Sequence, residues 1–233
     1  AALRGVGLEL ERLANHVGDL GALAGDVGFL PTASYCGRIR GDFLNLSAEL
    51  CGSRFGRGLV RPGGAGFDLD EAHVARLLER LEGAFADTQS AVELLWESPS
   101  VMERFEETGV VPREIAGALG LKGPAARASG LDRDARRDHP GGIYRFHHLP
   151  VSLADSGDVF ARAYVRWLEI QRSAAFVREQ LETLPLDGFE MYNLHANTVL
   201  NIAAAVGLIA KIADGAGLPH SDLTVMPLWS EDA

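Results

Sequence analysis

Charged side chains crowd into one segment in the middle of the chain, residues 123–140, which reads GPAARASGLDRDARRDHP. Its candidates for chemistry are Arg127, Asp134, Arg136 and Asp138. Charge-assisted hydrogen bonds from such arginines could hold an anion or order a path for protons, or they could tie the loop to itself. Because so many charges cannot be buried cheaply, composition favours a solvent-facing loop over the polar lining of a cleft.

A second set of candidates lies on the polar side of the first predicted helix. His16 and Asp26 continue a stripe that includes Arg12 and Asp19, at spacings that place all of them on one helix face. Histidine titrates near neutral pH, and a partly buried carboxyl group can have a raised pKa, so His16 and Asp26 could transfer protons. A salt-bridged, solvated helix face is the alternative interpretation.

The sequence lacks the usual motifs for nucleophilic catalysis, nucleotide binding and metal binding. It contains no nucleophile elbow, P-loop or dinucleotide fingerprint, which removes the best support for a simple hydrolase or a nucleotide-binding protein. His147 and His148 are adjacent and lack a second ligand pair at metal spacing. Cys36 and Cys51 show no CxxC spacing, so we expect a reduced, cytoplasmic setting. We therefore expect neither a metal site nor a cofactor site within this chain.

The charge and hydropathy of the chain limit its partners. A net charge of -10 argues against nucleic acid as the main partner, since a phosphate backbone favours a concentrated basic face. The most apolar stretch, residues 199–212, is too short and too interrupted to span a membrane. Any membrane association is thus expected through partner proteins. The chain starts at Ala1 without Met and enters a helical pattern at once, which is typical of a trimmed fragment.

Apolar residues recur every three or four positions over long stretches, which predicts helices that pack on one another. The predicted helices cover residues 3–27, 42–54, 70–96 and 154–184, and a last, almost wholly apolar one covers 196–213. Pro31 is expected to end the first helix, and Asp68 or Asp70 to cap the third.

The segments between these helices are rich in glycine. Residues 55–66 predict a short strand that ends in a turn, and residues 100–121 predict short helices separated by Gly109 and Gly120. The predicted fold class is therefore mainly α: an elongated helical bundle with little sheet.

Three segments, taken together, resemble one known family: GLELERLANHVGDLGALAGDVGF near the start, CGSRFGRGLVRPGG after it, and the charged segment 123–140. They are similar in order and spacing to the large subunit of energy-converting nickel-iron hydrogenases of the formate hydrogenlyase type. They also resemble its relative, the quinone-facing large subunit of respiratory complex I, the NADH-quinone oxidoreductase. The similarity covers residues 1–185 and implies the helical core of that subunit.

The resemblance implies an electron-transferring oxidoreductase that works between an iron-sulfur partner subunit and either protons and hydrogen or quinone. Such a protein lies beside the iron-sulfur small subunit and is peripheral to the inner membrane, on its cytoplasmic side, through membrane-arm subunits. Asp26 matches the helix acid beside the quinone site of complex I members, and His16 matches the Asn-His pair of the same helix. On this basis residues 127–138 are expected to face a cleft.

The chain also departs from the family. Neither cysteine pair that binds nickel and iron in hydrogenase members is present, and the early quinone contacts of complex I members precede Ala1. Residues 186–233 are unlike the family and are expected to form a helical segment packed on the core. We expect the isolated chain to be inactive, whereas the complete protein could hold a nickel-iron centre or a quinone. The alternative is a non-catalytic assembly or scaffold homologue that lost its metal site.

Overall fold

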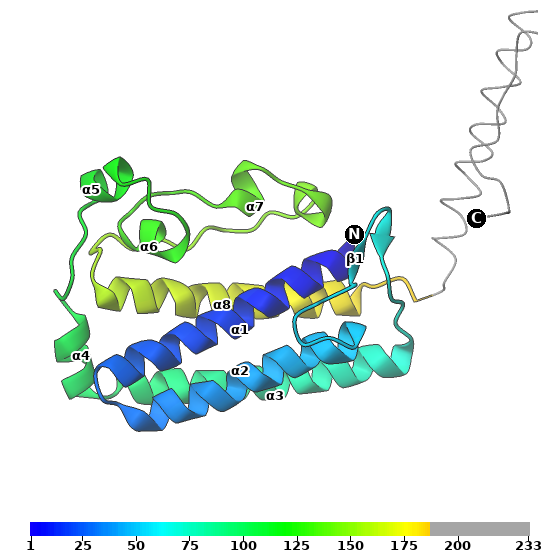
Figure 1. Cartoon of the computed structure of the whole chain (residues 1–233), viewed down its shortest axis with the longest axis horizontal. Helices are drawn as coiled ribbons and strands as arrows, with labels where there is room; N and C mark the ends of the chain where they lie inside the picture. The colour runs from blue at the N-terminus through cyan, green and yellow to red at the C-terminus, as the bar shows by residue number, and fades with distance from the viewer. Residues whose placement is uncertain (187–233) are drawn as a thin grey trace, which may run out of the picture. The chain divides into compact units, whose positions relative to one another are not determined.

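A computed structural model describes residues 1–186, in which four long helices lie side by side (Figure 1). They are α1 (Ala2–Asp26), α2 (Leu30–Cys51), α3 (Glu71–Trp96) and α8 (Val159–Glu182). At a rise of 1.5 Å per residue each is roughly 33–39 Å long, so the bundle is elongated. This arrangement confirms the mainly α class. The predicted helix 196–213 lies outside the described residues, as does the rest of 187–233.

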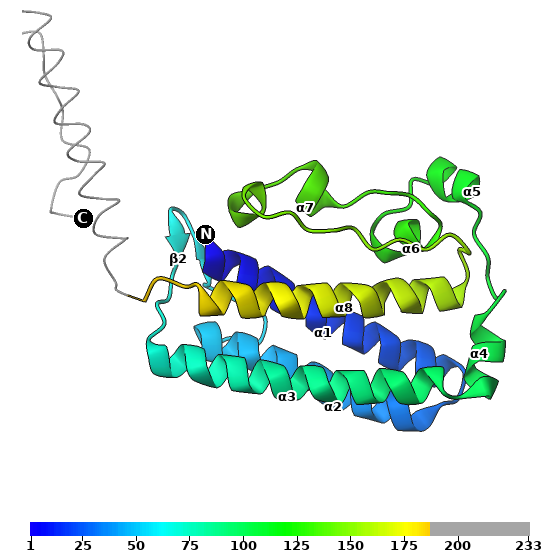
Figure 2. The same cartoon turned by 180° about the vertical axis from the view of Figure 1, so that it is seen from behind.

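Short elements connect the long helices. A hairpin of β1 (Val60–Arg61) and β2 (Gly64–Ala65) stands between α2 and α3. Between α3 and α8 the chain forms α4 (Pro99–Phe105), α5 (Arg113–Ala118), α6 (Gly123–Ala128), α7 (Ala135–Asp138) and the 3-10 helix η1 (Gly142–Arg145). Both views show the stretch from α5 to α7 along α8, on the side away from α3 (Figures 1 and 2). The charged segment 123–140 thus lies over the α1–α8 side of the bundle.

Three predicted helix boundaries are wrong. Helix α2 begins at Leu30 rather than at residue 42, because Pro31 lies in its first turn, where a missing N–H breaks no helical hydrogen bond. It ends before Gly52, which takes a left-handed φ of 71°. Helix α8 begins at Val159 rather than at residue 154, since the Asp158 carboxylate accepts from the N–H of Ala161 at 2.7 Å and caps the helix there.

Other local predictions are confirmed. Helices α1 and α3 match their predicted ranges, and Asp70 caps α3 by accepting from the N–H of His73 at 2.7 Å. The predicted strand and turn form the hairpin, in which Val60 pairs with Ala65. Short helices α4 and α5 occupy the stretch that holds Gly109 and Gly120. None of the helices described in residues 1–186 combines the length and the apolar character needed to cross a lipid bilayer.

The core is formed where the apolar stripes of the long helices face one another. Its fully buried large side chains include Leu10, Leu13 and Leu20 of α1, Ile39, Phe43 and Leu46 of α2, Leu77, Leu81 and Leu95 of α3, and Ile170 of α8. Helices α1 and α2 approach closely at Gly21, where an added Cβ would lie 2.8 Å from the Cβ of Cys36. Burial raises the pKa of the Cys36 thiol to about 11, so this cysteine is a packing residue rather than a nucleophile.

Candidate functional site

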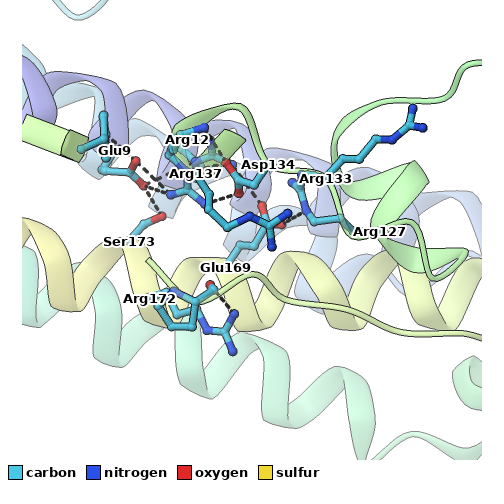
Figure 3. A network of polar contacts seen from close by, with 12 residues as sticks. Glu9, Arg12, Arg127, Arg133, Asp134, Arg137, Glu169, Arg172 and Ser173 are labelled. Carbon is cyan, nitrogen blue, oxygen red and sulfur yellow. Dashed lines mark hydrogen bonds and ion pairs between the residues drawn. The ribbon is translucent and has the colours of Figure 1, made fainter. Parts of the chain in front are cut away.

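The first centre of the site is the carboxylate of Glu9, which is fully buried on α1. Arg136 places Nη1 3.0 Å from both oxygens of this carboxylate. The hydroxyl of Ser173, on α8, donates to Oε2 at 2.6 Å, and the hydroxyl of Tyr144, on η1, donates to Oε1 at 2.7 Å. One glutamate of α1 therefore binds α7, η1 and α8 together. Figure 3 shows its contact with Ser173.

The second centre is the carboxylate of Glu169, which is buried on α8. Arg127, at the end of α6, donates from Nε to Oε1 at 2.6 Å. His16 of α1 lies with Nε2 2.7 Å from Oε2, and Arg12 donates from Nη1 to the same oxygen at 3.1 Å. Because the Nε of Arg12 also lies 3.4 Å from Glu9, Arg12 joins the two centres into one network.

The loop itself contributes a third carboxylate. Asp134 caps α7 by accepting from the N–H of Arg136 at 2.9 Å, and it also accepts from Nε and Nη2 of the same arginine at 3.0 and 2.7 Å. The N–H of Asp134 in turn donates to Asp138 at 3.0 Å. The guanidinium of Arg136 is thus held between its own loop and Glu9.

The network is balanced in charge. Its carboxyl groups belong to Glu9, Asp134 and Glu169, and its guanidiniums to Arg12, Arg127 and Arg136. Each charge finds opposite charges and hydrogen bonds inside the fold, which is the condition for burying ions without a large loss of stability.

The pKa shifts show which protonation states the network holds. Burial alone would raise the pKa of Glu169, but the hydrogen bond from His16 and the charge of Arg127 outweigh burial and hold it at about 2. Asp134 likewise has a pKa of about 2, because its contacts with Arg136 outweigh burial. Burial lowers the pKa of His16 despite its contact with Glu169. At neutral pH the carboxylates of Asp134 and Glu169 are ionised, and His16 is neutral and donates Nε2–H to Glu169.

Most of the predicted site residues come together in this network. His16 and Arg127 meet at Glu169, and Asp134 and Arg136 lie beside Glu9. The solvent-facing interpretation of the loop is wrong for Arg127, Asp134 and Arg136, which are only 3%, 5% and 9% exposed. The physical reason is that α1 and α8 supply buried carboxylates as partners. Whether the loop also borders a cleft with other segments stays a prediction.

Two predicted residues are not buried in this network, although Asp138 accepts from the N–H of Asp134 at its edge. Asp138 is at the surface, where Arg137 donates to it from Nε at 2.8 Å. Asp26 is the last residue of α1 and is exposed. At 1.5 Å per residue it lies about 15 Å along the helix from His16, so these two residues do not form a pair.

Sequence reasoning missed both glutamates at the centres of the network, together with Ser173 and Tyr144. The signal was present for Glu9, which stands three residues after Val6 and four before Leu13 and so falls on the apolar stripe of α1. An acid on a buried stripe requires a buried cation. The arginine-rich segment 123–140 could have been identified as the source of that cation.

The described residues do not fit a nickel-iron centre. Cys36 and Cys51 are both buried on α2, and their positions in the helix place them about 22 Å apart along its axis. No group of three or more His, Cys, Asp and Glu side chains within residues 1–186 is arranged to hold a metal ion. This part of the chain therefore supplies no ligand set for such a centre.

Comparison with known proteins gives a consistent family. Residues 26–207 match the family model described as the 49 kDa subunit of respiratory-chain NADH dehydrogenase. NADH-quinone oxidoreductase subunit 4 of Thermus thermophilus is 38% identical over 76% of this chain and 43% of its own length. An NADH-quinone oxidoreductase subunit of Anaeromyxobacter is 34% identical over 78% of this chain and 50% of its own length. The chain spans half or less of these relatives.

A solved structure has the same fold. A chain of the archaeal membrane-bound sulfane sulfur reductase, a respiratory membrane complex, aligns with a TM-score of 0.73 at 23% identity. The alignment covers 80% of this chain and 50% of that one. At this identity the likeness concerns the fold alone. The family match and the identities of the relatives show that the chain belongs to the family of the 49 kDa subunit of respiratory-chain NADH dehydrogenase.

Proposed function

We propose that the complete protein is an electron-transferring large subunit of the NADH-quinone oxidoreductase type, and that this chain supplies its helical core. The observation that carries the proposal is the family match over residues 26–207, supported by relatives that are NADH-quinone oxidoreductase subunits. In this role electrons pass from the iron-sulfur clusters of a partner subunit to quinone. The names of the relatives do not favour a scaffold protein.

The proposal includes partners and a location. The relatives are named as subunits of larger enzymes, so we expect an iron-sulfur small subunit beside this chain and membrane-arm subunits beyond it. The complete protein would then be peripheral to the membrane, on its cytoplasmic side.

The residues of this chain divide into two proposed roles. A quinone takes up two electrons and two protons when it is reduced to a quinol. Asp26 is the candidate for delivering a proton, because it is an exposed carboxyl group at the end of α1 and matches the helix acid of the family. Glu169 and Asp134 are poor proton donors near neutral pH, since their pKa values are about 2. We assign them, with Arg127 and Arg136, to positioning the loop.

The test uses the complete protein assembled with its partner subunits in membranes. Asp26→Asn should lower quinone reduction about tenfold or more, because general acid catalysis typically contributes at least that much. Asp68→Asn is the matched control, since Asp68 is another exposed aspartate, far along the chain from Asp26, with no hydrogen bond or ion pair among the described residues. The isolated chain should show no activity.

Two results would overturn the proposal. One is an assembled Asp26→Asn complex that reduces quinone at the rate of the unsubstituted complex. The other is stoichiometric nickel in the purified complex together with hydrogen production, which would assign the protein to the hydrogenase branch.

A further inference from the structure

A shallow groove lies where α1, α2 and the loop before β1 meet, away from the charged network. Its walls are one face of α1, with Gly7, Glu11 and Asn15, and one face of α2, with Arg40, Leu44 and Ser47. The loop closes it with Arg54, Phe55, Gly56 and Leu59. We call it the Arg40–Arg54 groove.

The two arginines of the groove have no partner within the part of the chain that the structure describes. Both are exposed, and neither makes a hydrogen bond or an ion pair there. Exposed arginines vary in this respect: Arg76 and Arg80 both pair with Glu49, whereas Arg57, like Arg40 and Arg54, has no side-chain partner among the described residues. The chain carries 32 acidic and 22 basic residues, so acids were available. Two guanidiniums that lack a partner among residues 1–186, in one groove of an acidic protein, indicate a site for an anionic group from outside.

Glycines shape this groove. The stem of Arg40 lies across Gly18 of α1, where an added Cβ would come within 2.9 Å of the arginine Cδ. The guanidinium of Arg54 lies over Gly41 of α2, 3.6 Å from the position of an added Cβ. Both side chains therefore lie against a helix at the edge of the groove, and both remain accessible to solvent.

The size and charge of the groove select its occupant. Its volume is about 100 Å³, whereas pockets for small-molecule ligands are usually about 300–1,000 Å³. It can therefore admit one side chain rather than a cofactor. Glu11 in the wall would repel a polyanion, but a single carboxylate can approach the arginines and the amide of Asn15. Phe55 is 71% exposed beside the groove and offers an apolar surface to a neighbouring residue.

We propose that the Arg40–Arg54 groove binds the carboxylate of one acidic residue from a partner subunit, with an adjacent apolar residue of that partner packed on Phe55. The inference rests on the proposed function only because it requires a partner subunit. It adds a docking point and the chemistry of the partner segment: an aspartate or glutamate next to an apolar side chain.

The first experiment locates the occupant. The complete protein is produced with its partner subunits and carries the photoreactive substitution Phe55→p-benzoylphenylalanine. Irradiation of the purified complex should crosslink position 55 to a partner peptide with an Asp or Glu within about four residues of the crosslink, as expected for one side of a short segment. A crosslink to a peptide without an acid, or to no partner, overturns the proposal.

The second experiment tests the charge. Arg54→Glu should lower retention of the crosslinked partner at least tenfold, Arg54→Gln should have a smaller effect, and replacing the mapped acid by Arg should restore binding to Arg54→Glu. Lys122→Glu is the control for net charge, because Lys122 is exposed on another part of the bundle and has no described partner. Circular dichroism of each full chain confirms that it is folded.

Contrary outcomes are distinguishable. Unchanged retention in Arg54→Glu, together with quinone reduction lowered about tenfold or more in Asp26→Asn, overturns this inference and leaves the proposed function intact. If the Asp26→Asn complex is fully active but Arg54→Glu no longer retains the partner, the proposed function is overturned and the docking inference stands. Saturable binding of inorganic phosphate to the full chain that is abolished by Arg54→Glu, without a charge-swap rescue, would identify a site for a free anion and overturn the docking role.

Discussion

The two sides of the bundle use charged residues in opposite ways. Between α2 and α3, Glu49 pairs with Arg76 and Arg80, whose side chains are 50% and 44% exposed, over a core of apolar side chains. Between the loop and the α1–α8 pair, Glu9 and Glu169 are buried with their arginines. The apolar core holds the first side together. On the second side, buried ion pairs add to a small apolar cluster of Ala128, Ala161 and Val165.

This difference has a consequence for stability. An exposed ion pair gains little because water screens it, so its loss changes little. A buried pair often contributes little relative to apolar residues of the same size, but removal of one partner leaves an uncompensated charge inside the fold. Substitution of a single charged residue should therefore lower the free energy of unfolding much more on the loop side than on the α2–α3 side.

The largest effect is expected for Glu9→Gln. The substitution keeps the shape of the side chain but removes one of the two counter-charges of the buried Arg136 guanidinium and leaves Asp134 as the other. The loss should be about 3–5 kcal/mol of unfolding free energy, measured by urea denaturation of the full chain. Glu79→Gln, at an exposed position of α3, is the control. A loss below about 1 kcal/mol would show that the loop does not depend on this ion pair.

The next effect concerns pH. The folded pKa of Glu169 is about 2, below its ordinary value of 4.5, because of His16 on α1 and Arg127 on α6. A carboxyl group with a lowered folded pKa stabilises the fold above its unfolded pKa, and this contribution is lost as the pH falls through the folded value. The shift corresponds to about 3 kcal/mol, lost between about pH 5 and pH 2.

Urea midpoints measured across this range would check the pH prediction. The variant Glu169→Gln should be less stable at neutral pH and should lose less stability on acidification. His16 also makes the fold less stable as the pH falls, but at higher pH than Glu169. Burial lowers the pKa of His16 in the folded state, so below about pH 6.5 the unfolded chain takes up a proton more readily than the folded one. Equal pH dependence with and without the Glu169 carboxyl group would contradict the assignment.

The same comparison explains what the sequence could predict. Apolar periodicity is a local property, so it located α1 and α3 closely and predicted a helical bundle. The predicted start of α2 is wrong because that prediction treats Pro31 as a helix breaker. Proline is also common in the first turn of a helix, which is where Pro31 lies. The site was harder, because the partner of Arg136 lies 127 residues away, at Glu9. Local charge patterns identified the arginines as candidates. They could not show that Glu9 and Glu169, on two helices far away in the sequence, are the buried partners of these arginines.

A smaller effect is expected for Ser173→Ala. The hydroxyl donates to Glu9 at 2.6 Å, and hydrogen bonds to charged groups contribute about 1.5–3 kcal/mol. Ser90→Ala, where an exposed hydroxyl donates to the Ala86 carbonyl, serves as the control. If the hydroxyl acts through the network, its loss should matter less once Glu9 is Gln, and a double-mutant cycle in urea measures this coupling. Strictly additive losses would place Ser173 outside the network.

The smallest effect is expected for Glu49→Gln on the opposite side. Its carboxylate accepts from the Nε of Arg76 at 3.2 Å, but solvent reaches both arginine partners. The loss in urea unfolding should be below about 1 kcal/mol. It should shrink further in about 1 M salt, because the screening length there is about 3 Å. The loss from Glu9→Gln should persist in salt, since its ions are buried. If Glu49→Gln were as costly as Glu9→Gln, exposure would not be what distinguishes the two sides of the bundle.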